Sequence, residues 1–432
     1  MESKIKLFPT DIFFLILSIF SFTYLRKYLV IFVPVFLIAS FFFLKLRINS
    51  NSIIVLLLVA LISIVTSFFH GIYILNNLIS IALVMSPLLI LFGRAGMKPH
   101  SLSERFILIS SSVLLFVDFT AVLDLLIHVF DVGFIASDDT FQGIYGNSGL
   151  SMHTLSLVNY LYALLFYFRK SYLQASAFLI SGLLCFFGAG LMTFLLTILI
   201  FILLLRNGIK FYFSVLVSIA SIVLILKVIN PSSYNYFLYN VTEFVVNLNS
   251  TNYEDELNLA KSGKASIAPR KLTFHIGVLK RLQENPEIIL IGTGPGTYNS
   301  RTSFLLNGDY SKIEYLKETI RIRPPMADED VYPLWDTSIL FQYNDGTRNE
   351  PFSSIVSVMM EYGVPIAFII FLLSIKKVTT LARNNHVNGM FIKLSFIFFL
   401  LCLLGDNYIE YPEVTLIYFV LLKTFEIDLQ HN

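Results

Sequence analysis

The chain has 432 residues, of which 56% are apolar and only 14% are charged, and its mean hydropathy is +0.74. Soluble globular chains carry about 25% charged residues, so this composition excludes a soluble enzyme and a disordered protein. A formal net charge of +2 argues against nucleic-acid binding, which usually needs a strongly basic surface. The two cysteines, Cys185 and Cys402, lie in apolar runs, and their spacing predicts neither a zinc site nor a disulfide framework.

Long apolar stretches predict that the chain crosses a membrane twelve times. A spanning helix needs about 20 mostly apolar residues. The first stretch follows Lys4 and Lys6, as in a secretory signal, but no small-residue cleavage site comes after it, so we expect a retained helix. Gly188-Ala189-Gly190 divides the long stretch after residue 171 into two spans. The predicted spans are 8–25, 28–46, 51–69, 74–92, 106–130, 153–169, 172–188, 189–205, 209–229, 352–374, 390–405 and 409–423.

Basic residues in the short loops predict the direction in which these spans cross the membrane. Cytoplasmic loops are usually richer in Lys and Arg than loops on the outer side. With twelve spans, most of the basic residues near span ends face the cytoplasm, and we expect both termini to be cytoplasmic. Of the short outer loops only the first is basic, with Arg26 and Lys27.

Two outer loops are too long to be plain connectors. The first covers 131–152, and the second covers 230–351 and holds 27 of the 60 charged residues, twelve basic and fifteen acidic. Loops carried on a rigid scaffold are where binding sites tend to lie. We therefore expect an all-α integral membrane protein in three parts: nine spans in 1–229, a mainly helical extracytoplasmic domain in 230–351, and three spans in 352–432.

An amphipathic helix is predicted at 270–284 in the outer domain. Its apolar residues recur at helical spacing, and Asn285-Pro286 ends it. Arg270 and Arg281 point nearly the same way, about 16 Å apart along the axis, and Gly277 between them would let a ligand come close. This pattern is typical of an anion-binding face, and equally typical of a solvated basic face.

A glycine-rich run follows this helix. Gly292, Gly294 and Gly296 stand within five residues, and they permit positive φ and close backbone approach. N–H groups in such a run can hold phosphate oxygens, but no Gly-Lys-Ser/Thr follows, so the run is not a Walker loop. A plain turn is the more common use of such a sequence.

Charged residues cluster further along the outer domain. Arginines there are further candidates for anion binding, and carboxylates are candidates for a general base, although an acidic run in a loop is more often simply solvated. No metal-ligand spacing stands out. The candidates are Arg301, Arg321 and Arg323 for binding and Asp328, Asp336 and Glu350 for the base.

Ionisable residues also fall inside predicted spans. Asp118 lies in mid-segment, and Asp124 and His128 lie one helical turn apart nearer the outer side. Glu361 lies within the tenth predicted span. Acidic side chains in a membrane are costly and are functional candidates by default, with an interhelical hydrogen bond as the alternative.

Four features together resemble the bacterial O-antigen polymerase and ligase superfamily, which comprises multi-span transferases of lipid-linked glycans. One feature is the layout, with about a dozen helices and one large outer loop between late spans. The others are short motifs whose order along the chain carries the resemblance. They are Arg270 and Arg281 ahead of Gly292-x-Gly294-x-Gly296, with ten residues between Arg281 and Gly292; Gly143-Ile144-Tyr145-Gly146-Asn147; and Ser353-Ser354 leading into Glu361-x-Gly363.

The resemblance implies a polymerase that transfers a growing glycan from undecaprenyl diphosphate to the next lipid-linked repeat unit, on the outer face of a bacterial inner membrane. It implies a metal-independent, inverting glycosyltransferase without a cofactor, with undecaprenyl-diphosphate-linked oligosaccharides, membrane lipid and a chain-length regulator as partners. Arginine suits this reaction because it pairs with phosphate in two places and stays charged. For this reaction the candidates for catalysis are Arg270, Arg281, Glu350, Asp336 and Asp328. The candidates for substrate binding are Gly292, Gly294, Gly296, Arg301, Arg321, Arg323, Asn147 and Glu361.

Departures from the family pattern separate the alternatives. Phe141-Gln142 stand where the family often has an Arg before Gly143. Ligases typically carry a His-Asn pair where the large loop re-enters the membrane, and the stretch 349–353 contains no His, which favours a polymerase. A transporter of lipid-linked sugars is the third alternative, but a transporter has less use for an outer domain of 122 residues.

Overall fold

The computed structural model describes residues 8–96, 101–132, 141–146, 151–204, 252–264, 270–307, 321–336, 351–385 and 387–429, with isolated positions between 217 and 242. Secondary structure in these residues is helical, apart from one antiparallel pairing of two short strands, β1 (Leu46–Arg47) and β2 (Arg94–Ala95). The predicted ninth span, 209–229, lies outside the described ranges except for isolated positions.

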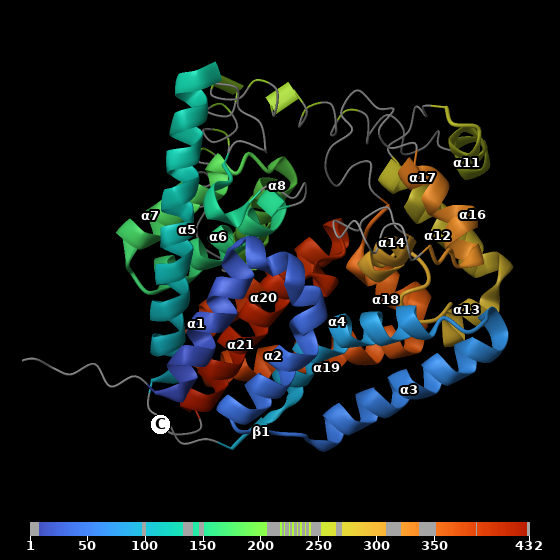
Figure 1. Cartoon of the computed structure of the whole chain (residues 1–432), viewed down its shortest axis with the longest axis horizontal. Coiled ribbons are helices and arrows are strands. Elements are labelled where there is room, and N and C mark those ends of the chain that lie inside the picture. The colour runs from blue at the N-terminus through green and yellow to red at the C-terminus, as the bar shows by residue number, and fades with distance from the viewer. Residues whose placement is uncertain are drawn as a thin grey trace, which may run out of the picture.

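The first half of the chain forms a bundle of apolar helices, with α5 standing at one edge (Figure 1). Short 3-10 helices occupy two outer turns. The bounds are α1 (Pro9–Phe22), η1 (Tyr24–Tyr28), α2 (Leu29–Phe43), α3 (Ser50–His70), α4 (Ile74–Phe92), α5 (Leu102–Val132), η2 (Gly143–Tyr145), α6 (Ser151–Phe168), α7 (Tyr172–Leu184) and α8 (Gly188–Leu204).

The second half contains the outer-domain helices, gathered at the upper right of Figure 1, and then returns to the bundle. The outer helices are α11 (Tyr253–Lys261), α12 (Arg270–Glu284), α13 (Pro286–Ile291), α14 (Arg301–Asn307), α16 (Pro325–Asp330) and α17 (Tyr332–Asp336). The returning helices are α18 (Ser354–Tyr362), α19 (Val364–Asn384), α20 (Gly389–Gly405), η4 (Tyr408–Glu410) and α21 (Pro412–Leu429).

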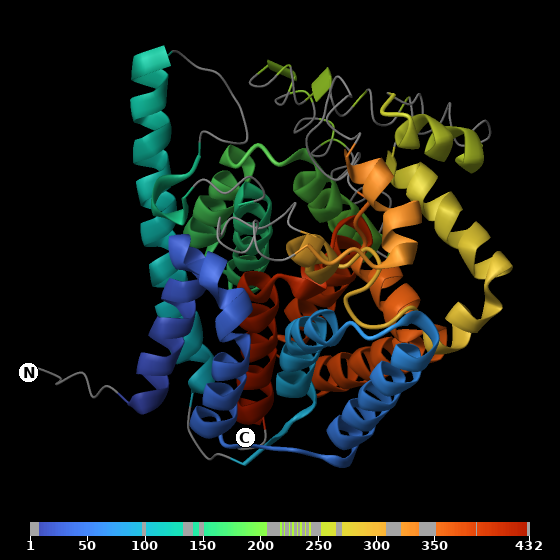
Figure 2. The same cartoon turned by 45° about the vertical axis from the view of Figure 1, so that its right-hand side comes forward.

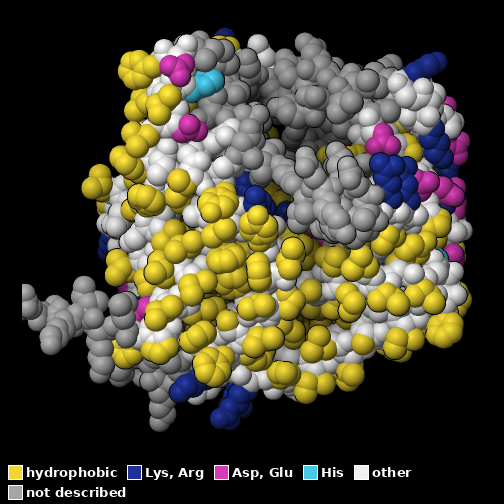
Figure 3. Space-filling view, in the orientation of Figure 1, with side chains coloured by type: hydrophobic (Ala, Val, Ile, Leu, Met, Phe, Trp, Pro, Cys, Tyr) yellow, Lys and Arg dark blue, Asp and Glu magenta, His cyan; other side chains and the backbone are white. Residues whose placement is uncertain are grey.

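Five of the described helices are long and apolar enough to cross a membrane, as judged by length and composition. Figure 3 shows a belt of hydrophobic side chains, with charged side chains gathered above it and basic ones at its lower edge. These features indicate a helical membrane protein, and the count of twelve spans stays a prediction. The five helices are Tyr24–Phe43, Ser52–His70, Ile74–Phe92, Leu102–Asp131 and Val364–Asn384, with shorter apolar helices at Pro9–Phe22, Tyr172–Leu184, Gly188–Leu203 and Gly389–Gly405.

Helix α21 lies at the centre of the bundle (Figure 2). It packs against α1, α4 and α5, and almost every residue from Pro412 to Phe425 is buried. A helix that is apolar on all sides is stable only when other elements surround it. The N-terminal end of α21, together with η4, therefore lies in the middle of the bundle, at the end that we predict to face outward.

The prediction of one continuous span over 352–374 is wrong. The helix breaks at Gly363, where φ is +81° and an added Cβ would lie 2.5 Å from the carbonyl oxygen of Leu290. Only glycine tolerates this conformation and this close approach. Glu361 therefore lies in α18, which ends before the candidate span formed by α19.

Labelling of introduced cysteines tests the predicted orientation. Glu284 in the outer domain and Arg47 at the opposite end of the bundle are both exposed, while the native Cys185 and Cys402 are buried and should not react. With a membrane-impermeant maleimide, we expect Glu284→Cys to be labelled in intact cells and Arg47→Cys only after permeabilisation. The reverse pattern would show that the chain has the opposite orientation.

Candidate functional site

The glycine run encloses the carboxylate of Glu361. One oxygen of Glu361, which is fully buried, accepts hydrogen bonds from the backbone N–H of Tyr298 (2.9 Å) and Ser300 (3.1 Å), and the other accepts one from Gly296 (2.6 Å). A buried carboxylate is tolerated when donors surround it in this way. The run therefore folds around a side chain of α18 and joins the outer domain to the membrane bundle.

Other N–H groups of the glycine run donate hydrogen bonds to backbone carbonyl oxygens. The N–H of Thr293 donates to Met360 O (2.7 Å), and that of Gly294 donates to Glu361 O (3.1 Å). Gly292 has φ +72°, and an added Cβ there would lie 2.5 Å from the Glu361 carbonyl oxygen. In this structure the run serves as the contact with α18, and its binding of a phosphate stays a prediction.

A second buried carboxylate, Glu410 of η4, lies beside the first. It is 1% exposed and accepts hydrogen bonds from the N–H of Thr302 (3.1 Å), the hydroxyl of Thr302 (3.3 Å) and the hydroxyl of Ser80 (3.2 Å). Sequence reasoning missed Glu410 because it stands at the edge of an apolar segment, where a charged residue normally marks the end of a span. Its partners Thr302 on α14 and Ser80 on α4 lie 108 and 330 residues away in the sequence.

Burial raises the pKa of both Glu361 and Glu410, and the charge of Glu410 raises the pKa of Glu361 further. The hydrogen bonds that each carboxylate accepts oppose this effect. Both residues lie outside the candidate spans. At neutral pH the two carboxyls therefore hold a proton more readily than isolated glutamates do.

Arg301 begins α14 directly after the glycine run. Its guanidinium carbon lies 4.1 Å from the centroid of the Tyr411 ring, and its Nη1 donates to the carbonyl oxygen of Glu410 (3.2 Å). Together with Phe304, Phe352, Asn407 and Tyr411 it surrounds a narrow gap that is too small for a water molecule. Stacking on a ring fixes the plane of a guanidinium, which suits it to oriented binding of an anion.

Asp406, at the end of α20, is a third buried acid, and it differs from the two glutamates. It is 1% exposed, and its Oδ1 accepts a hydrogen bond from the N–H of Asn407 (2.5 Å). Its Oδ2 has no hydrogen-bond partner among the described residues. Burial raises the pKa of Asp406, while the nearby cations of Lys271 and Arg301 lower it.

Lys271 lies on the first turn of α12, next to Arg270. Its Nζ donates to the carbonyl oxygen of Gly405, immediately before Asp406. Through Lys271, helix α12 thus places a positive charge against the bundle. The side chain of Arg270 lies outside the described residues, so its predicted role stays a prediction.

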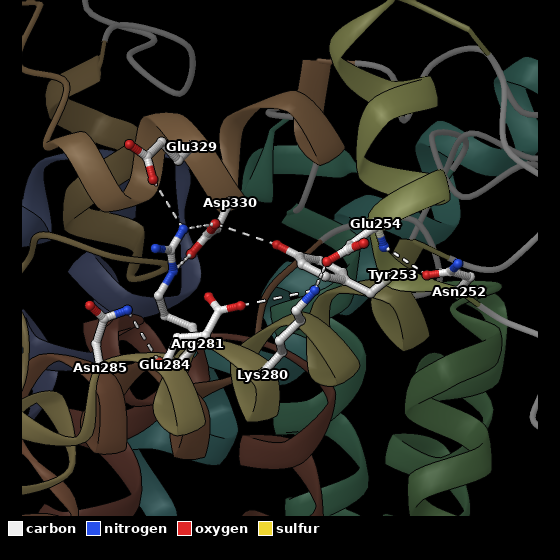
Figure 4. Close-up of polar contacts among 9 residues, drawn as sticks. All are labelled: Asn252, Tyr253, Glu254, Lys280, Arg281, Glu284, Asn285, Glu329 and Asp330. Atoms are coloured by element: carbon white, nitrogen blue, oxygen red, sulfur yellow. Dashed lines mark hydrogen bonds and ion pairs between the residues drawn. The ribbon is translucent and has the colours of Figure 1, made fainter.

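Arg281 lies in an ion cluster, shown in Figure 4. Its Nε and Nη2 donate to the two oxygens of Asp330 (2.7 and 2.5 Å), and Nη2 also donates to Glu329 (3.1 Å). The phenols of Tyr253 and Tyr298 donate to Asp330 as well (3.4 and 3.2 Å). These bonds hold α12 against α16, and they engage Arg281 with carboxylates of the protein itself.

Gly277 serves the packing of the same helix. A Cβ added at this position would lie 2.2 Å from the ring of Tyr253, on α11. We predicted that a glycine here would let a ligand come close to the arginine stripe. In the structure the space beside it is filled by the tyrosine that also bonds to Asp330.

The remaining outer-domain candidates lie on the surface or outside the described ranges. Arg323 donates to Asn307 (2.7 Å) and to Asp328 (3.1 Å), and both partners of that ion pair are about half exposed. The guanidinium carbon of Arg323 also lies 5.3 Å from the centroid of the Tyr332 ring. Arg321 and Asp336 are exposed, and the predicted sites at Glu350 and Asn147 lie outside the described residues.

The acids predicted inside the membrane contact neighbouring helices. Asp118 is buried in α5 and accepts a hydrogen bond from the amide of Asn159 in α6 (3.0 Å). Asp124 accepts one from the N–H of Gly143 (3.2 Å) and so fixes the start of η2. Asp118 thus makes the interhelical hydrogen bond that was the alternative to a functional role, although its Oδ2 has no hydrogen-bond partner among the described residues.

The chain matches no family model and no curated protein sequence in comparisons with known proteins. The resemblance to the polymerase and ligase superfamily therefore rests on the motif residues and their order along the chain.

Replacement of Arg281 tests whether the ion cluster is structural. Arg281→Gln leaves Asp330, whose side chain is 4% exposed, without its paired cation. We expect the outer domain to lose about 3 kcal/mol of stability, measured as a lower melting temperature in detergent. Arg321→Gln, at an exposed position, is the matched control. Wild-type stability in Arg281→Gln would show that the arginine is retained for another purpose.

The pH dependence of stability tests the buried glutamate pair. A carboxyl whose pKa is higher in the folded than in the unfolded chain stabilises the folded state at low pH, and this contribution is lost as the pH rises through the folded-state pKa. We therefore expect the melting temperature to fall between about pH 5 and about pH 9. Glu410→Gln should flatten the profile, whereas Glu329→Gln, an exposed control, should not. A flat wild-type profile would contradict the expected shifts.

Proposed function

We propose that the protein is a polymerase of lipid-linked glycan repeat units, acting on the outer face of a bacterial inner membrane. One observation carries the proposal beyond the sequence resemblance. Arg301 is stacked on Tyr411 at the junction of the helical bundle and the outer domain, beside the buried carboxyl of Asp406. A cation and a carboxylate at this junction fit a reaction between lipid-anchored substrates whose sugars lie in water.

Arg301 would stabilise the leaving group. When the hydroxyl of the acceptor sugar attacks the anomeric carbon of the donor, a new C–O bond forms and the bond to the diphosphate oxygen breaks. The electron pair of that bond leaves with undecaprenyl diphosphate, whose negative charge increases. A fixed guanidinium lowers the energy of that state, and the nearby ammonium group of Lys271 adds to the effect.

Asp406 would accept the proton of the attacking hydroxyl. The three buried acids are distinguished by their hydrogen bonds. Glu361 and Glu410 each accept three from the protein, whereas Oδ2 of Asp406 has no such partner among the described residues. A buried polar atom without a partner calls for an explanation, and a substrate hydroxyl would supply the missing donor.

This assignment differs from the candidates predicted from the sequence. We propose Arg301 and Asp406 for the reaction in place of Arg281 and of the surface acids Asp328 and Asp336. Glu350, the third predicted candidate for the base, lies outside the described residues. Arg270 remains a candidate for holding the donor, since it directly precedes Lys271 on α12.

Reconstitution with one defined substrate tests the proposal. The purified protein in liposomes receives a single undecaprenyl-diphosphate repeat unit, and the products are separated on a gel. We expect a ladder of multiples of the repeat from the wild type and from Arg321→Ala. Arg301→Ala and Asp406→Asn should lower the rate by at least about a hundredfold, and Arg301→Lys should only partly restore it, because lysine cannot make the paired contact.

The outcomes separate the rival functions. Absence of a ladder with folded wild-type protein would overturn the polymerase proposal. Transfer to an added lipid A–core acceptor would then indicate a ligase. Movement of the labelled lipid between leaflets without a new glycosidic bond would indicate a transporter.

A further inference from the structure

Asp118 is an acidic residue in the interior of the bundle. It lies in the middle of α5, a helix that is long and apolar enough to cross a membrane, and it is 3% exposed. An ionised carboxylate at such a position is stable only with a cation or with several hydrogen-bond donors around it. Glu361, for comparison, accepts three hydrogen bonds from backbone N–H groups.

The side chains around Asp118 are polar but uncharged. The amide of Asn159 on α6, which stands beside α5 in Figure 1, donates to Oδ1 (3.0 Å). The hydroxyl of Ser181 on α7 also interacts with the carboxyl, and the buried thiol of Cys185 is the titratable group beside it. No basic side chain of the described residues acts on this carboxyl. These contacts do not balance a full negative charge.

Two oxygen atoms of this contact lack a hydrogen-bond donor. They are Oδ2 of Asp118 and Oδ1 of the fully buried Asn159, and neither has a partner among the described residues. Both atoms are acceptors when the carboxyl is ionised, so they cannot bond to each other. A proton on Oδ2 turns that atom into a donor. A planar acid and a planar amide can then form two hydrogen bonds in one ring, and a single proton accounts for both unpartnered atoms.

A sodium ion is the competing occupant of such a site. A hard cation needs oxygen ligands from several sides. At the end of α7, however, the carbonyl oxygens of Ser181 and Gly182 already accept hydrogen bonds from the N–H of Cys185 (3.2 Å) and the hydroxyl of Ser156 (3.2 Å). A proton needs only the two atoms that lack a partner, so the geometry favours a proton.

We propose that Asp118 and Asn159 form a proton-binding site inside the bundle, in which the protonated carboxyl donates from Oδ2 to the amide oxygen of Asn159. The proton leaves the pair neutral and adds a second hydrogen bond between α5 and α6. Loss of the proton would place an unbalanced charge beside an acceptor oxygen and weaken this contact. The site is independent of the reaction proposed for Arg301 and Asp406.

The same part of α5 holds η2. Thr120, two residues after Asp118, accepts a hydrogen bond from the N–H of Ile144 (3.1 Å), and Asp124 accepts one from the N–H of Gly143 (3.2 Å). Gly143 has φ +51°, and an added Cβ there would overlap the Thr120 hydroxyl, so η2 packs closely on α5. The proton at Asp118 therefore stabilises the stretch of α5 on which η2 is fixed.

Infrared spectroscopy of the purified protein at neutral pH tests the site. A protonated carboxyl gives a C=O stretching band that a carboxylate lacks, and an exposed aspartate is ionised at this pH. We expect this band in the difference spectrum of wild type minus Asp118→Asn. It should be absent from the difference spectrum for Asp124→Asn, which removes an exposed acid of the same helix. Asp118→Asn should fold, because two amides can pair in the same geometry.

Asn159→Leu tests the pairing itself. In this variant the band should shift to higher frequency, because the carboxyl loses its amide partner, and an unshifted band would overturn the pairing with Asn159.

The melting temperature in sodium chloride and in choline chloride separates the two occupants. We expect the same value in both salts. A rise in sodium chloride that is lost in Asp118→Asn would assign the site to a cation and overturn the proton site. A difference spectrum without the carboxyl band, together with no sodium effect, would show that Asp118 is ionised and would overturn it as well.

Discussion

The hydrogen bonding of the Glu361 carboxylate by the glycine run is the interaction on which the rest of this molecule depends. Three backbone N–H groups converge on one side chain that is fully buried. An uncompensated charge in that position would cost several kcal/mol, so the run and α18 hold each other in place. This contact fixes the start of α14 and, with it, the position of Arg301. It therefore holds the helices of the predicted outer domain in a fixed position on the ends of the bundle helices.

The acidic residues around this contact differ in the number of hydrogen bonds that they accept from the protein. Glu361, Glu410 and Asp330 accept several bonds from the protein and hold elements together. Asp406, which lies near Arg301, accepts one hydrogen bond and keeps a buried oxygen without a partner among the described residues. The residues that hold elements together thus lie beside the residue that we propose as the base.

Hydropathy predicted the helices of the bundle well, because burial in lipid requires long apolar segments with few exceptions. It could not predict the break at Gly363, since the surrounding sequence stays apolar and the cause is a contact with Leu290, far away in the chain. Helical spacing on α12 allowed either a substrate-facing or a solvated Arg281, whereas in the structure its guanidinium pairs with Asp330. Arg301 was one candidate among several, and Asp406 was not predicted because its partners come together only in three dimensions.

The central position of α21 has a consequence for biosynthesis. The helices that surround it, α1, α4 and α5, enter the membrane hundreds of residues before α21 is translated. Until then the centre of the bundle has to be filled by lipid or by a temporary partner such as an insertion factor. Because η4 and Tyr411 arrive with α21, the surroundings of Arg301 cannot be completed on a nascent chain. Newly made protein would therefore lack the proposed activity until its insertion is nearly finished.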